Sequence, residues 1–138
     1  MTARNNLKVS KPNTPSFIVR LFAPIIWTCI IFWLSLTPSP PQLPGILGWD
    51  KLLHAGAYGL LALLIAQFLL CFLANPANVW WQAGLVAVGF GALLEILQLL
   101  AQTGRTAEWW DLFADAVGAF LCCVIFRQIQ GVLCRRNG

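Results

Sequence analysis

Four long apolar runs alternate along the chain with short segments that are rich in polar residues, proline or glycine. The apolar runs cover about residues 17–37, 52–73, 79–101 and 109–126. Each run is close to the roughly 20 residues that a helix needs to cross the hydrocarbon core of a bilayer. The pattern therefore predicts an all-α fold, a membrane-embedded bundle of four transmembrane helices.

The segments between the runs contain the residues that end helices. Four prolines and two glycines lie between residues 38 and 48, and proline interrupts a helix because it lacks the backbone N–H. Residues 74–78 form a short turn, so we expect the second and third helices to pack as an antiparallel hairpin. We predict three parts: a disordered cytoplasmic tail over 1–16, a four-helix domain over 17–128, and a basic cytoplasmic tail over 129–138.

Composition supports the membrane class. The 138 residues are 59% hydrophobic and 10% charged, whereas an ordinary soluble domain has about 25% charged residues. The net charge of +4 comes from the tails and not from a basic stripe interleaved with aromatic residues. We therefore expect the lipid bilayer, and not nucleic acid, to be the partner of the chain. The five cysteines and the single histidine lack the spacing of a metal site, so we expect no metal and no cofactor.

Lysine and arginine are distributed unevenly between the two sides of the predicted bundle. The side of the two termini has seven of them, and the opposite side has only Lys51 and Arg105. The positive-inside rule therefore predicts that both termini are cytoplasmic. A cleaved signal peptide is the alternative for the first run, but Ser35-Leu36-Thr37 is a poor match to a small-x-small cleavage site.

The distinctive polar residues gather on the side opposite the termini. They recur every three or four residues, which places each set on one face of its helix. The predicted pocket residues are Asp50, Lys51, His54, Tyr58, Glu95, Gln98, Arg105, Asp111 and Asp115. A carboxylate within a membrane helix costs about 2.5–3.5 kcal/mol on insertion scales unless it is paired or hydrated. We therefore expect these polar faces to meet inside the bundle.

Acids outnumber bases on this side, because Glu108 adds a fifth acid to the four in the pocket, against Lys51 and Arg105. Burying an ionised carboxylate without a partner is costly. We therefore expect that at least one acid, Glu95 or Asp115, is protonated or meets a cation.

Four functions fit this cluster. It could bind a polar or charged ligand in a pocket that opens outward, or it could only join the helices. His54 with the carboxylates could perform acid–base catalysis on a lipid-linked substrate, but no serine, cysteine or complete metal-ligand set accompanies it, so an enzyme is the less favoured interpretation. Proton-coupled transport would require a homo-oligomer, since four short helices are too few to enclose a pathway.

The order and spacing of these residues resemble the VanZ-like family. The resemblance covers about residues 31–125 and is carried by Ser35-x-x-Pro38, Asp50-Lys51-x-x-His54-x-x-x-Tyr58, Glu95-x-x-Gln98, Arg105 and Asp111-x-x-x-Asp115-x-x-Gly118. Two positions depart from the family pattern: Thr103, where the family commonly has proline, and Asp115, where it often has asparagine.

The resemblance implies a multi-pass protein of the bacterial cytoplasmic membrane with a role in the cell envelope. Its expected ligand is a lipid-linked or cell-surface polar group, related to the cell wall. The family takes its name from a member linked to teicoplanin resistance, which makes glycopeptide antibiotic resistance one function to test.

Overall fold

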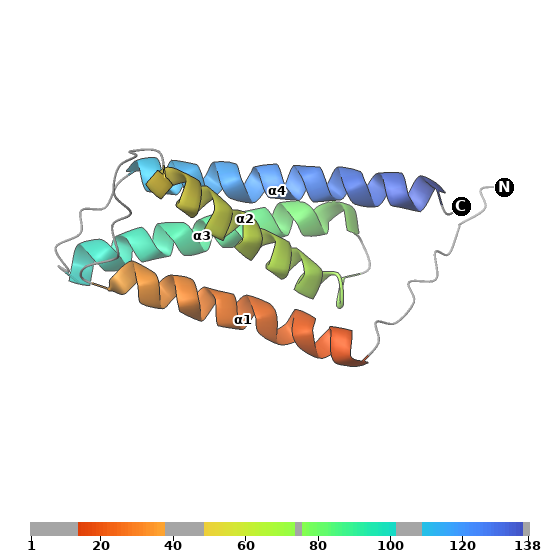
Figure 1. Ribbon diagram of the computed structural model, residues 1–138, viewed down its shortest axis with the longest axis horizontal. Coiled ribbons are helices and arrows are strands. Elements are labelled where there is room, and N and C mark those ends of the chain that lie inside the picture. The colour runs from red at the N-terminus through yellow and green to blue at the C-terminus, as the bar shows by residue number, and fades with distance from the viewer. Residues whose placement is uncertain (1–13, 38–48, 74–75, 102–108, 137–138) are drawn as a thin grey trace.

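A computed structural model describes residues 14–37, 49–73, 76–101 and 109–136 of the chain, and every element in these ranges is helical (Figure 1). The helices are α1 (Thr14–Leu36), α2 (Trp49–Leu69), α3 (Pro76–Ala101) and α4 (Trp109–Arg136). Each contains a segment of 19 to 24 residues that is long and apolar enough to cross a membrane. The prediction of an all-α bundle of four membrane-spanning helices is confirmed, and the chain is a multi-pass membrane protein.

Successive helices run in opposite directions, so the bundle has two distinct ends (Figure 1). We call the end that contains the last turns of α1 and α3 and the first turns of α2 and α4 the polar end. The opposite end, where α1 and α3 begin, is the far end. α2 crosses the bundle obliquely and makes its most extensive contact with α4, whereas α1 packs mainly on α2 and to a smaller extent on α3.

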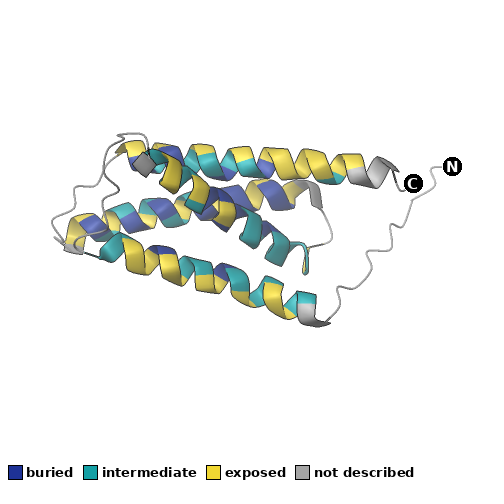
Figure 2. Ribbon diagram, in the orientation of Figure 1, coloured by how far each residue is buried: buried dark blue, intermediate teal, exposed yellow. Residues whose placement is uncertain are grey.

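Small residues bring α2 and α4 into contact at the backbone. A Cβ atom added to Gly118 of α4 would overlap the backbone of Ala55 of α2, and one added to Gly59 would lie 3.1 Å from the carbonyl oxygen of Gly118. Helices in lipid associate through close packing, which small residues permit. Buried residues line the inside of the bundle and exposed apolar residues cover its outside (Figure 2), as lipid-facing helices require.

The fourth helix is longer than its apolar run. It was expected to end near residue 126 and instead continues to Arg136, through part of the expected basic tail. The extension packs against α3 at the far end, where Trp80 Nε1 donates a hydrogen bond of 3.0 Å to Gln130 Oε1 and the Trp80 ring stacks on Phe126. A helix satisfies its own backbone groups, so it can continue past the membrane boundary that hydropathy marks.

The other helices also begin earlier than the apolar runs. α1 begins at Thr14, inside the expected tail, and α2 and α3 each begin three residues before the predicted start. The predictions for the loops after α1 and α3, and for residues 1–13, lie outside the described residues.

Candidate functional site

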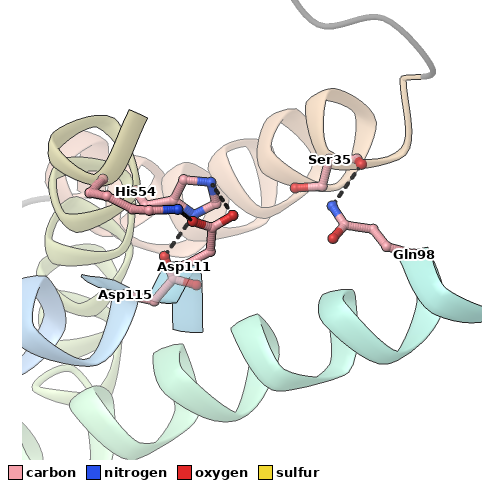
Figure 3. A network of polar contacts seen from close by, with 6 residues as sticks. Ser35, His54, Gln98, Asp111 and Asp115 are labelled. Carbon is pink, nitrogen blue, oxygen red and sulfur yellow. Dashed lines mark hydrogen bonds and ion pairs between the residues drawn. The ribbon is translucent and has the colours of Figure 1, made fainter. Parts of the chain in front are cut away.

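The first turns of α2 and α4 bring four ionisable side chains together at the polar end (Figure 3). Lys51 and His54 share one face of α2, three residues apart, and Asp111 and Asp115 share one face of α4, four residues apart. The Lys51 ammonium pairs with Asp111 Oδ1. We call these four residues the charged network.

His54 lies between the two carboxylates. Its Nδ1 atom is 3.0 Å from Asp115 Oδ1, which is a hydrogen bond, and its Nε2 atom is 3.7 Å from Asp111 Oδ2, within ion-pair range. Asp115 is 1% exposed, so it has almost no access to solvent or lipid. Both nitrogens of the imidazole ring therefore face an acid.

The net charge of the network can be zero without a bound ion or ligand. An imidazolium carries a proton on each nitrogen, so a protonated His54 would face both carboxylates as a cation. Together with Lys51 it would balance the two negative charges of Asp111 and Asp115. Pairing of this kind is what makes charges tolerable inside a membrane protein.

Tyr58 continues the same face of α2 one turn deeper. Its ring is parallel to that of His54, with ring centroids 6.4 Å apart, and the residue is only 3% exposed. No described residue donates to or accepts from its hydroxyl group, although the carboxylates of Asp115 and Glu95 lie within electrostatic range. The hydroxyl is thus a buried polar group that packing alone does not explain.

Gly91 of α3 closes this part of the site, and the sequence did not mark it as a site residue. A Cβ atom added there would lie 2.8 Å from Asp115 Oδ2 and 3.0 Å from Tyr58 Cε1. α3 can therefore approach the acid and the phenol only because residue 91 has no side chain. The available signal was that Gly91 lies one helical turn before Glu95 on the same face.

Gln98 makes a contact that the sequence did not predict. Its side chain is buried, and its Nε2 atom donates a hydrogen bond of 2.9 Å to the backbone carbonyl of Ser35 (Figure 3). It joins α3 to the last turn of α1, apart from the charged network. Glu95, one turn away on α3, is partly buried.

Five of the nine predicted pocket residues therefore lie together: Lys51, His54, Tyr58, Asp111 and Asp115. Arg105 lies outside the described residues, as does the side chain of Asp50, whose backbone belongs to α2. Within the described ranges, no group of three or more histidine, cysteine, aspartate or glutamate residues could hold a metal ion. The expectation of no metal or cofactor stays a prediction, as does the binding role of the nine residues.

A groove runs along the outside of the bundle, next to the charged network. It has a volume of about 450 Å³ and lies between the first turns of α2 and α4. Its lining is apolar apart from Lys51, which thus contributes both to the groove and to the network.

The chain matches no protein-family model, and no match was found among curated proteins or solved structures. The interpretation of the site therefore depends on its own geometry and on the sequence pattern.

Proposed function

We propose that the chain is a VanZ-like protein of the bacterial cytoplasmic membrane whose polar end faces away from the cytoplasm. The charged network, with Tyr58 and Glu95, forms a pocket that binds or modulates a lipid-linked or cell-surface polar group. The observation that carries the proposal is that four ionisable side chains from two helices pair with one another inside the membrane-spanning segments, at the polar end. Ionisable residues inside a membrane are costly and usually functional.

Joining the helices is not a sufficient reason for this network. α2 and α4 already meet at the backbone through Ala55, Gly59 and Gly118. Buried ion pairs stabilise weakly, because their attraction must first offset the desolvation of both charges. Small residues already hold the two helices together, so the charged network needs another explanation. A ligand whose own charges interact with Lys51, His54 or the two acids provides one.

The proposed orientation of the chain in the membrane is based on the distribution of lysine and arginine. Seven lysines and arginines lie on the side of the two termini and two on the side of the polar end, which supports cytoplasmic termini. Reporter fusions at residue 46, at residue 76 and at the C-terminus test it. A cytoplasmic signal at residue 46 would invert the proposed orientation.

The functional test uses bacterial strains with and without the protein, exposed to teicoplanin and to inhibitors of cell-wall synthesis. We expect His54→Gln and Glu95→Gln to abolish any protection while the amount of protein in the membrane stays unchanged. Gln130→Leu is the matched control, because it removes an interhelical hydrogen bond at the far end and should leave protection intact. Loss of protein from the membrane in His54→Gln and Glu95→Gln, but not in Gln130→Leu, would favour a purely structural network.

Catalysis is the alternative that one observation favours. The hydrogen bond between His54 Nδ1 and Asp115 fixes the ring as an acid–base group is fixed in enzymes, with Nε2 towards the more exposed Asp111. This alternative predicts turnover of a lipid-linked substrate by purified protein, at a rate that falls in His54→Ala. Saturable binding with unchanged substrate would eliminate it. A proton-coupled transporter would instead show pH-dependent flux in proteoliposomes.

A further inference from the structure

The groove between α2 and α4 begins at the polar end and runs into the membrane-spanning part of the bundle. Leu52 and Ala55 form its α2 wall, and Trp110, Phe113 and Val117 form its α4 wall. From residue 110 to residue 117 the α4 wall extends for about 10 Å, at 1.5 Å per residue. This is about a third of the hydrocarbon thickness of a bilayer, so the groove can hold the upper part of one lipid chain.

The depth of the groove is set by the aromatic residues beside its mouth. Trp109 and Trp110 open α4 and are largely exposed on the outside of the bundle. Tryptophan at the end of a membrane helix prefers the level of the lipid headgroups. The mouth therefore lies at headgroup level, and the walls below it lie among the hydrocarbon chains.

Among the described residues that line the groove, Lys51 is the one with a charged side chain, and it lies at the mouth. The Lys51 side chain is 32% exposed, whereas that of its partner Asp111 is 11% exposed. Of the two charges, the ammonium is therefore the one that an approaching headgroup meets. Lysine is a common ligand of phosphate groups, and a lysine beside the headgroups attracts anionic lipid.

We propose that the groove binds a single anionic phospholipid, with its phosphate beside Lys51 and one hydrocarbon chain along Leu52, Phe113 and Val117. This inference rests on the proposed function and deepens it, since it assigns a phosphate-bearing lipid as the ligand class of the polar end. Lys51 is the shared element: its ammonium contributes to both the charged network and the mouth of the groove. Occupation of the groove would thereby act on Asp111 and, through it, on His54.

The test is photocrosslinking of the full chain in phosphatidylcholine nanodiscs. The probe is phosphatidylglycerol with a diazirine in its chain, and diacylglycerol with the same labelled chain is the control that lacks phosphate. Labelled residues are identified by fragmentation mass spectrometry. We expect label on residues 110–117, and about fivefold more of it from phosphatidylglycerol, the factor expected of one lysine beside an anionic headgroup.

Two pairs of variants separate the groove from folding. Val117→Phe fills the groove and should remove most of the label, whereas Val124→Phe makes the same change two turns along α4, at another exposed position outside the groove, and should not. Lys51→Gln should abolish the preference for phosphatidylglycerol, and Lys51→Arg should retain it. If Lys51→Gln does not fold, the Val117 pair still decides the test.

Three outcomes would overturn the inference. They are equal labelling of Val117→Phe and Val124→Phe, even labelling of all exposed helix faces, and equal labelling by phosphatidylglycerol and diacylglycerol. Loss of protection in His54→Gln with no lipid label would refute the groove and leave the proposed function standing. Lipid label at the groove, with no phenotype in the network variants, would refute the proposed function and leave the lipid-binding groove standing.

Discussion

At the polar end α2 and α4 are joined by two acids, a lysine and a histidine, whereas at the far end α3 and α4 are joined by one neutral hydrogen bond, from Trp80 to Gln130, and a stacked ring. Both regions connect helices, and both include buried polar groups. At the far end, the described contact between two helices therefore consists of a neutral hydrogen bond and aromatic packing, with no ion pair among the residues that form it. The polar end differs in its ionisable groups, and this difference is the reason to assign them a ligand.

The largest effect is expected from removing one acid of the network. Asp111→Ala leaves Lys51 and His54 without one of their carboxylates, and a buried charge that loses its partner costs about 3–5 kcal/mol. Replacing both members of the pair with apolar residues, Lys51→Met with Asp111→Leu, should restore most of the free energy of unfolding. Denaturation in mild detergent measures both variants.

The double variant separates stability from function. We expect it to fold well and yet to lose protection and lipid preference, because the exposed lysine that a headgroup would meet is removed. A double variant with full activity would contradict the proposed function, since the network would then serve only to hold α2 and α4 together.

The second-largest loss in the free energy of unfolding is expected where α3 lies close to the network. Gly91→Ala places a methyl group 2.8 Å from Asp115 Oδ2 and 3.0 Å from Tyr58 Cε1, and overpacking of this kind costs about 1–3 kcal/mol. Gly89→Ala is the matched control on the same helix, because nothing lies within 4 Å of its added Cβ. That control should be neutral or stabilise the helix slightly. Equal unfolding free energies for the two variants would contradict the described packing.

These glycines illustrate what the sequence could predict. The four helices follow from runs of about 20 apolar residues, and the meeting of His54 with Asp115 follows from polar residues at helical spacing on two neighbouring helices. The sequence predicted no site role for Gly91, because its importance depends on the side chains of α2 and α4 that surround it. The distance between two helices depends on the side chains of both, so it cannot be predicted from the sequence of one helix alone.

The acceptor of the Gln98 hydrogen bond and the end of α4 are two further features that the sequence did not predict. The bond from Gln98 is to a backbone carbonyl of Ser35, and no side-chain pattern identifies a backbone acceptor. The apolar run predicted an end of α4 near residue 126, whereas the helix continues to Arg136 and contacts Trp80 through Gln130. Both features involve contacts between residues far apart in the sequence, which a local sequence pattern does not predict.

A smaller effect is expected at the far end. Gln130→Leu removes the acceptor of the Trp80 hydrogen bond, and hydrogen bonds between membrane helices contribute about 0.6 kcal/mol on average. We expect a loss of that size in the unfolding free energy and no change in protection or lipid labelling. Gln128→Leu is the control, because Gln128 is exposed on the same helix. A loss as large as that of Asp111→Ala would remove the contrast between the two ends.

The smallest effect is expected from Tyr58→Phe. The change removes a hydroxyl that is buried and has no hydrogen-bond partner among the described residues, while it keeps the ring that stacks on His54. A polar group left unsatisfied on folding contributes no stability, so its removal should be neutral or slightly stabilising. Tyr58→Leu, which also removes the ring, is the control that should destabilise the bundle. Loss of protection in Tyr58→Phe at an unchanged unfolding free energy would mean that the hydroxyl contacts the ligand, as the proposed pocket implies, whereas full protection would exclude the hydroxyl from the pocket.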